Sequence, residues 1–282
     1  MTRTILPVLL IALFSTPARA GEAPASPLTV VICYPGGPVR AADAKPAMDS
    51  MLAVIEEIGQ WDKGSITCEF ASKVNECRKL MAGKDPHFAI LSVGLYLEHM
   101  QKHQLVPVAQ PNVEGRTTDT YRILVRKGSF DSLAALKGKS LGGTLLGEPR
   151  FLKKVVFKSK IDPAKHFKLK PSRRALRALR NLSKGRKLDA VILNEQQYKS
   201  LGSLPFADKL EVVFTSEPIP LVGLLANTKK TTKHERGRIT QALSSMCTHD
   251  KGKELCQMFG IESFGPANAA SYQKIMTLWK SK

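Results

Sequence analysis

The chain has 282 residues, 43% of them hydrophobic, and carries 43 Lys and Arg against 24 Asp and Glu, a formal net charge of +19. That apolar content is enough for a sizeable core, and neither a low-complexity tract nor a repeat of fixed period occurs, which excludes a disordered chain or a solenoid. The charge is local, because residues 150–187 contain fifteen Lys or Arg and one acid, Asp162.

Residues 1–20 predict a secretory signal peptide. They have a basic start at Arg3, an apolar centre from Ile5 to Phe14, and Ala18-Arg19-Ala20 before Gly21. The apolar centre is too short to span a membrane, and the final residues fit a cleavage site. No Cys follows that site, so a lipid anchor is not expected. The mature protein is therefore expected in the periplasm, where disulfides can form.

The first half of the mature chain alternates strands and helices. Leu28 to Tyr34 is a continuous apolar, β-branched run, typical of a strand buried on both faces, and it ends in the loop 35–38. The following pattern predicts helices over 45–58, 75–81 and 95–97 and strands over 65–70, 87–91 and 105–109. Right-handed crossovers turn such a βαβαβ order into a doubly wound parallel sheet.

The second half begins with a strand over 121–125, a helical turn over 132–136 ended by Gly138, and a strand over 140–144. The Gly-containing loop 145–149 then leads into a helix from Arg150, and backbone N–H groups at such a junction can hold an anion. Ser172 is expected to cap a helix whose buried stripe is Ala175, Leu176, Leu179 and Leu182. Strands over 188–193 and 212–215 follow.

These motifs, in this order, carry a resemblance to a known family. The segment 121–152 reads strand, charged turn, Ser-Leu-x-x-Leu-Lys-Gly-Lys, strand, Gly loop and helix; Phe88 to Tyr96 and Asp250 to Ile275 match further patterns. The chain resembles the phosphate/phosphonate-type periplasmic substrate-binding proteins of ABC transporters. The resemblance implies the type II periplasmic-binding fold: two doubly wound α/β lobes joined by two crossing segments, with a cleft between them. Lobe 1 would comprise 21–115 plus 221–282, and lobe 2 would comprise 116–220.

The resemblance also implies a function. The protein would bind a small, anionic, phosphonate- or phosphate-like ligand by lobe closure and pass it to an ABC permease in the inner membrane. A monomer without cofactor or enzymatic activity is expected. In agreement, the sequence has no G-x-S-x-G, H-E-x-x-H, Walker loop or paired catalytic carboxylates.

Ligands of open α/β sheets bind beyond the carboxyl ends of the strands. Four loops meet that rule here, although each can also be an ordinary turn. They supply ten candidate ligand-binding residues: Tyr34, Gly36, Gly37, Ser92, Tyr96, Thr144, Gly147, Arg150, Asn194 and Glu195.

One loop departs from the family pattern. Phosphonate receptors have Ser-Thr-Ser-Gly in the second lobe, whereas Leu145-Leu146-Gly147-Glu148-Pro149 follows Thr144 here. The loop has lost hydroxyls, Pro149 lacks an N–H, and Glu148 would repel a dianion. Arg150 would either clamp an anion or be a solvated helix arginine. An alternative is therefore a degenerate receptor that acts as a cell-envelope interaction or sensory protein through its basic face.

The cysteines suggest one disulfide and leave the others open. Cys247 and Cys256 flank a turn between two helical patterns and are expected to pair. Cys68 with Cys77 is the next pairing, and Cys33 with Cys68 competes with it. One thiol must remain free, and Cys33, in an apolar strand, is expected to be buried.

The basic segment 150–187 has three interpretations: a solvated helical face, attraction to an anionic envelope surface, or steering of an anionic solute. Nucleic acid is not expected as a partner, because the chain is exported and no aromatic residues alternate with the arginines. His99 and His103 are four residues apart, but no third ligand accompanies them. They are expected to be surface histidines, and no metal site is predicted.

Overall fold

The computed structural model describes residues 27–35, 41–172 and 174–281. The predicted signal peptide and two candidate ligand residues, Gly36 and Gly37, lie outside these ranges. None of the described helices is both long and apolar enough to cross a membrane.

Lobe 1 is built on a six-stranded sheet with the order β13-β4-β12-β3-β1-β2. Its strands are β1 (Leu28–Cys33), β2 (Ile66–Ala71), β3 (Phe88–Ile90), β4 (Leu105–Asn112), β12 (Leu224–Asn227) and β13 (Ser263–Pro266). β1 pairs in parallel with β2 and β3, as expected, but β12 is antiparallel to β3 and β4, and β13 is antiparallel to β4. The predicted parallel arrangement of the first three strands is thus confirmed, and the whole sheet is mixed because β12 returns from the other lobe against the direction of its neighbours.

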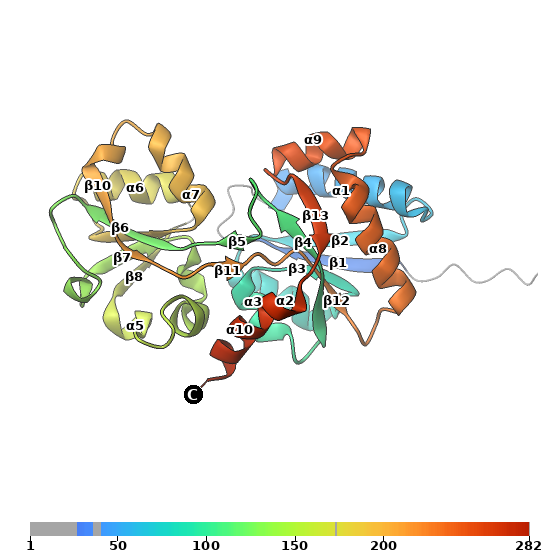
Figure 1. Cartoon of the computed structure of the whole chain (residues 1–282), viewed down its shortest axis with the longest axis horizontal. Coiled ribbons are helices and arrows are strands. Elements are labelled where there is room, and N and C mark those ends of the chain that lie inside the picture. Colours follow the sequence, from blue (N-terminus) through green and yellow to red (C-terminus); the bar gives the residue numbers. More distant parts are fainter. Residues whose placement is uncertain (1–26, 36–40, 173, 282) are drawn as a thin grey trace, which may run out of the picture.

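Helices cover both faces of this sheet (Figure 1). They are α1 (Ala41–Gly59), α2 (Val74–Lys84), α3 (Val93–His99), α8 (Lys233–Met246), α9 (Asp250–Met258) and α10 (Ala269–Lys280). Alternate residues of β1 separate the two layers: Val30 and Ile32 pack with α1, α8 and α9, while Val31 and Cys33 pack with α2, α3 and α10. A strand buried on both faces thus explains the unbroken apolar run at its start.

Lobe 2 has a five-stranded sheet with the order β10-β6-β9-β7-β8. The strands are β6 (Arg122–Arg126), β7 (Ser140–Gly143), β8 (Lys168–Pro171), β9 (Ala190–Leu193) and β10 (Leu210–Thr215). The helices are α4 (Pro149–Phe151), the π-helical turn η3 (Leu152–Val156), α5 (Pro163–His166), α6 (Ala175–Ser183) and α7 (Glu195–Lys199). Short 3₁₀ turns are η1 (Ala134–Leu136), η2 (Leu145–Gly147), η4 (Ser200–Ser203) and η5 (Ala207–Lys209).

Two short strands connect the lobes. β5 (Thr118–Asp119) leads from lobe 1 to lobe 2, and β11 (Ile219–Pro220) leads back. They pair antiparallel, with Ile219 opposite Asp119 and Pro220 opposite Thr118, and Figure 1 shows them between the two sheets. Two α/β lobes joined by two crossing segments confirm the fold class predicted from the sequence.

One buried apolar cluster continues from lobe 1 into lobe 2. It contains Val31 and Ala89 of the first sheet, Ile123 and Ile192 of the second, and Phe151 between them. The C-terminal helix α10 takes part, since it contacts both η3 and β11. The lobes of this structure therefore lie against each other, with a shared apolar contact beside the crossing strands.

Two local predictions need correction. Arg174, not Ser172, is the N-cap residue of α6, and it makes no side-chain capping bond; the Ser172 hydroxyl instead accepts a hydrogen bond from the Arg174 N–H. Leu176 is 47% exposed, and Ala178 takes its place beside Leu179 and Leu182 in the buried face. The helix therefore starts two residues later than expected, and Leu176, in its first turn, lies outside the buried face.

The histidine prediction was also wrong. His99 and His103 are both buried, and the Nδ1 atom of His103 lies 2.7 Å from an Asp85 carboxylate oxygen. All residues of α3 except Glu98 are buried, and the His99 ring at its end lies 5.6 Å, centroid to centroid, from the His103 ring in the turn that follows. No group of three or more His, Cys, Asp or Glu suited to a metal ion occurs among the residues described above.

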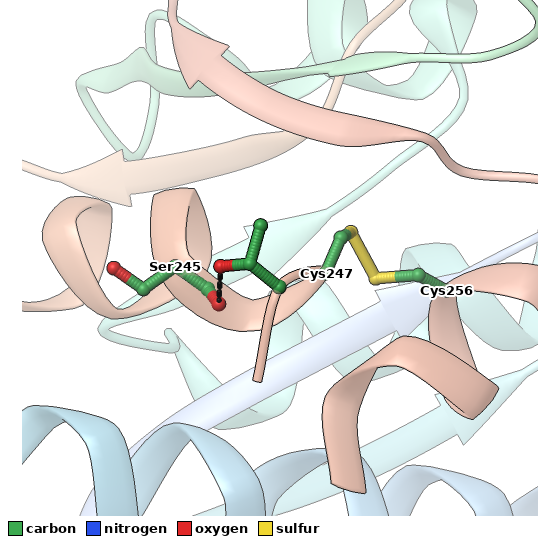
Figure 2. Close-up of a disulfide and its surroundings, with 4 residues drawn as sticks. Ser245, Cys247 and Cys256 are labelled. Atoms are coloured by element: carbon green, nitrogen blue, oxygen red, sulfur yellow. Dashed lines mark hydrogen bonds between the residues drawn. A yellow bond between two sulfur atoms is a disulfide. The ribbon is translucent and has the colours of Figure 1, made fainter. Parts of the chain in front are cut away.

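Cys247 and Cys256 form a disulfide, with an S–S distance of 2.10 Å (Figure 2). Cys247 caps the end of α8, and Cys256 lies in α9, so the bond fixes the turn between these helices. The Thr248 hydroxyl also donates to the Ser245 carbonyl at 2.9 Å. Cys33, Cys68 and Cys77 are free thiols, so neither of the two alternative pairings is formed here.

Candidate ligand site at the lobe interface

Polar residues of both lobes follow the carboxyl ends of their strands. Tyr34 comes after β1, Ser92 after β3, Thr144 after β7 and Asn194 after β9. These ends are where a doubly wound sheet offers free backbone and side-chain groups, because the helices begin there. Two of the four residues belong to each sheet, so the candidate site lies between the lobes.

A polar contact between the lobes joins Ser92 and Glu148. The Ser92 hydroxyl donates a hydrogen bond of 2.9 Å to Oε2 of Glu148, and it accepts a 3.4 Å bond from the Leu95 N–H as the N-cap of α3. Glu148 is only 5% exposed. Burial raises the pKa of Glu148 to about 7, against the opposing effects of the Ser92 hydrogen bond and the positive charge of Arg78.

Two glycines allow this close approach. A Cβ atom at Gly94 would lie 2.0 Å from Oε2 of Glu148 and 2.8 Å from Cβ of Phe151. A Cβ atom at Gly147 would lie 2.8 Å from Cγ2 of Val74. Gly147, a candidate ligand residue, is thus placed directly against α2 of the opposite lobe.

A second polar group surrounds Asp119 in the crossing strand. Its Oδ1 accepts from the N–H groups of Thr120 at 2.8 Å and Glu195 at 2.9 Å, and burial raises the pKa of this carboxyl. Tyr34 is 49% exposed as a whole, but partial burial, with the negative charge of Asp119, raises the pKa of its phenol. Burial, with the nearby charges of Asp119 and Glu148, also raises the pKa of Tyr121 well above its usual value. The negative charge of Asp119 thus acts on both phenols.

Asn194 and Glu195 are engaged by the protein itself. The Asn194 side chain accepts from the Gln197 N–H at 2.9 Å and forms a capping box with it. The Gln197 amide in turn donates to the Thr144 hydroxyl at 3.1 Å. Glu195 forms ion pairs with Arg122 and, at 3.4 Å, with Arg116. Thr144, Asn194 and Glu195 are thus brought to one side of the interface.

The arginine pair adds positive charge to this side. Arg116 lies beside the crossing strand β5, and Arg122 starts β6, where its guanidinium stacks over the Tyr198 ring at 4.3 Å from the centroid. The contact with Glu195 neutralises part of the pair's charge. An anion replacing the Glu195 carboxylate would meet two guanidinium groups in a partly buried setting.

Two candidates contact the C-terminal helix. Arg150 is exposed, and its guanidinium stacks 4.1 Å over the ring of Trp279 in α10. Tyr96 is 1% exposed; its ring packs edge-on against Tyr272, and its hydroxyl lies 3.8 Å from Sδ of Met276. Both side chains therefore contact α10, and ligand contact by Tyr96 and by Arg150 stays a prediction.

Sequence reasoning missed Asp119, Arg116, Arg122 and Gln197 as site residues. The first two lie in the polar passage between the lobes, where no periodic pattern marks one residue from the next. Gln197 is three residues after Asn194, so the capping-box spacing could have found it. Glu148 was noted only as a charge that would repel a dianion.

A family model for the periplasmic substrate-binding proteins of phosphonate ABC transporters matches residues 43–272. Among solved structures, a binding protein component of an ABC phosphonate transporter from Pseudomonas aeruginosa is 16% identical; the alignment covers 90% of this chain and 85% of that one, with a TM-score of 0.68. A Xanthomonas citri protein solved with ATP is 16% identical, with 90% and 96% coverage and a TM-score of 0.67. PhnD1 from Prochlorococcus marinus, in complex with methylphosphonate, is 15% identical, with 90% and 97% coverage and a TM-score of 0.63. No curated protein sequence matches the chain.

Proposed function

Because the chain belongs to the family of periplasmic substrate-binding proteins of phosphonate ABC transporters, we propose that it binds one small anionic solute between its lobes and delivers it to a membrane permease. Members of this family are solute-binding subunits of transporters, not enzymes. We further propose that the lobes comprise 21–115 plus 221–282 and 116–220, that 1–20 is a signal peptide, and that the protein acts as a monomer without cofactor.

The observation that carries the proposal is the convergence of strand ends from both sheets on the crossing strands. Tyr34 and Ser92 come from lobe 1, Thr144 and the Arg122–Glu195 pair come from lobe 2, and Asp119 lies between them. A ligand touched by both lobes favours the closed arrangement over the open one by the free energy of the contacts it makes only there. Lobe closure is thus the expected response to solute.

The ligand class is proposed to be phosphonate- or phosphate-like, as in the methylphosphonate complex of PhnD1. In this chain Leu145 and Leu146 replace two hydroxyl residues of the family pattern, and Leu146 is buried in the shared apolar cluster. The anion would therefore be held by Ser92 and Thr144 hydroxyls and by the Arg116 and Arg122 guanidinium groups. Fewer hydroxyl donors predict weaker binding than in receptors that keep all of them.

A thermal-shift screen tests this function with phosphate, methylphosphonate, sulfonates, thiamine-like compounds and amino acids as probes. A stabilising ligand is expected among the anions, and Thr144→Ala should abolish the shift. Thr277→Ala, an exposed threonine in α10, serves as the matched control and should leave the shift unchanged. If no probe stabilises the protein, or if Thr144→Ala binds as well as the wild type, the cleft is not the solute site.

A second candidate function, interaction with an anionic envelope surface, is favoured by a groove in lobe 2. The groove has a volume of about 820 Å³ and lies between β8 and α6. Its lining carries four basic and no acidic side chains among the residues described: Lys170, Ser172, Arg174, Arg177, Asn181 and Lys187, with Pro171, Ala178 and Leu188. Such a concave basic surface attracts phosphate-rich surfaces at low ionic strength.

Sedimentation with anionic lipid vesicles tests the second function. Binding should fall with added salt and be lost in the double variant Arg174→Glu/Arg177→Glu. The control double variant Lys63→Glu/Lys253→Glu makes the same change of net charge with exposed residues of lobe 1. If both double variants lost vesicle binding equally, the net charge of the protein, and not the groove, would be responsible for the binding.

A further inference from the structure

The Glu148 carboxylate crosses from one lobe to the other. It lies between η2 and α4 of lobe 2, yet its hydrogen-bond partner is in lobe 1: the Ser92 hydroxyl donates to it at 2.9 Å, and that hydroxyl in turn accepts a 3.4 Å bond from the Leu95 N–H. A buried carboxylate whose hydrogen-bond donor comes from the opposite lobe is a specific contact, because either group would be costly to bury without its partner.

The packing around this contact leaves no room for a side-chain atom on either side. At Gly94 a Cβ would overlap the carboxylate and Phe151, and at Gly147 a Cβ would overlap Val74. Glycine is thus required once in each lobe where the backbones approach. In contrast, a Cβ at Gly83, in α2, would meet nothing within 4 Å.

We propose that Glu148 is a built-in latch, which closes the lobes in the absence of solute by accepting a hydrogen bond from the Ser92 hydroxyl at the N-terminus of α3. It is autoinhibitory, because a solute can reach the interface only after this contact breaks. That consequence for the solute depends on the proposed transport function; the latch itself does not.

The latch is pH-dependent, because closure buries its carboxyl. The charged and titratable groups that face Glu148 are Arg78 of α2 and Glu98 of α3, which bind each other through two hydrogen bonds of 2.8 and 2.9 Å, together with Tyr121, just before β6, and Cys33 of β1. The Arg78–Glu98 pair contributes opposite charges that largely offset each other. Burial therefore dominates and raises the pKa of Glu148 from 4.5 to about 7.

The direction of this pH dependence follows from proton binding in the closed and open states. The closed state holds the proton up to about pH 7, whereas an exposed Glu148 in the open state would lose it near pH 4.5. Closure is therefore favoured at low pH and weakened as pH rises from 4.5 to 7. With these two pKa values the closed-to-open ratio falls about 70-fold between pH 5 and pH 8.

Hydrogen exchange of the ligand-free full chain tests the latch. The protection factor of the Leu95 amide, divided by that of Val31 in the centre of β1, should fall about 70-fold from pH 5 to pH 8 in the wild type. Glu148→Gln keeps a neutral acceptor and should give a ratio that does not change with pH. Glu148→Ala and Gly94→Ala should give a low ratio at both pH values, and small-angle scattering should show a larger radius of gyration. Gly83→Ala should behave like the wild type.

Two results would overturn the latch: an Ala variant at position 148 as compact and as protected as the wild type at pH 5, or a Glu148→Gln variant that keeps the pH dependence. Because these measurements use no solute, they do not depend on the transport function. Titration of the same variants with inorganic phosphate tests that function separately. Failure of phosphate to bind any variant would count against phosphate as the solute and leave the latch intact.

Discussion

The disulfide between Cys247 and Cys256 should make a measurable contribution to stability. The two cysteines are nine positions apart, so the bond closes a loop of ten residues. The chain-entropy relation for such a loop gives a stabilisation of about 2.7 kcal/mol, because the bond restricts the unfolded chain. Cys256 is also buried where α9 meets α1 and α8, so loss of the bond should loosen this packing.

The perturbation is the double substitution Cys247→Ala/Cys256→Ala, compared with the wild type by urea unfolding. We expect the free energy of unfolding to fall by about 2–3 kcal/mol and the melting temperature by about 4–12 °C for a chain of this size. Dithiothreitol should lower the free energy of unfolding of the wild type to that of the variant, and it should not change that of the variant. Thiol titration of the unreduced, denatured wild type should find the three free cysteines. Five reactive thiols, or a stability loss below about 0.5 kcal/mol, would refute the reasoning.

Three further predictions follow from single contacts. Arg150→Ala should lower the free energy of unfolding by about 1 kcal/mol through loss of the stacking on Trp279, without changing the affinity for any probe found in the screen. Cys68 is half-buried, and burial raises its pKa to about 11, so in the native protein it should react slowly with a thiol reagent. It should still react before the buried Cys33 and Cys77. Faster labelling of Cys33, followed by mass spectrometry, would contradict the packing. His87 accepts a 3.1 Å hydrogen bond from the Thr29 N–H, and burial lowers its pKa below 6.5. The stability that neutral His87 gives the folded protein should therefore be lost as the pH falls below 6.5. Between pH 7.5 and pH 5.5 the free energy of unfolding should fall more in the wild type than in His87→Gln.

Much of the fold could be predicted because its signals are local. The run from Leu28 to Tyr34 identified the central strand, since both faces of β1 are covered by helices. The family patterns identified two lobes and their order. β13 was missed because Ser-Phe-Gly-Pro contains no apolar run; it belongs to the sheet only through its pairing with β4. The start of α6 was missed because the capping residue contributes no side-chain bond.

The candidate site was only partly predictable. The rule that ligands bind at the carboxyl ends of strands selected Tyr34, Ser92, Thr144 and Asn194, and the structure brings these to the lobe interface. The same rule could not assign partners: Arg150 stacks on Trp279, 129 positions later, and Ser92 meets Glu148, 56 positions later. Such contacts depend on how the two sheets are placed, which short motifs do not encode.

The amino-acid sequence by itself determined the alternation of strands and helices, the two-lobed family and the local concentration of positive charge, because periodicity and motif order are properties of neighbouring residues. Only the tertiary structure decided that lobe 1 has a mixed sheet, that His99 and His103 are buried, and that the Glu148 carboxylate lies between the lobes. Each of these depends on which distant segments exclude water from a side chain or supply its hydrogen-bond partner. That environment exists only after the chain has closed on itself.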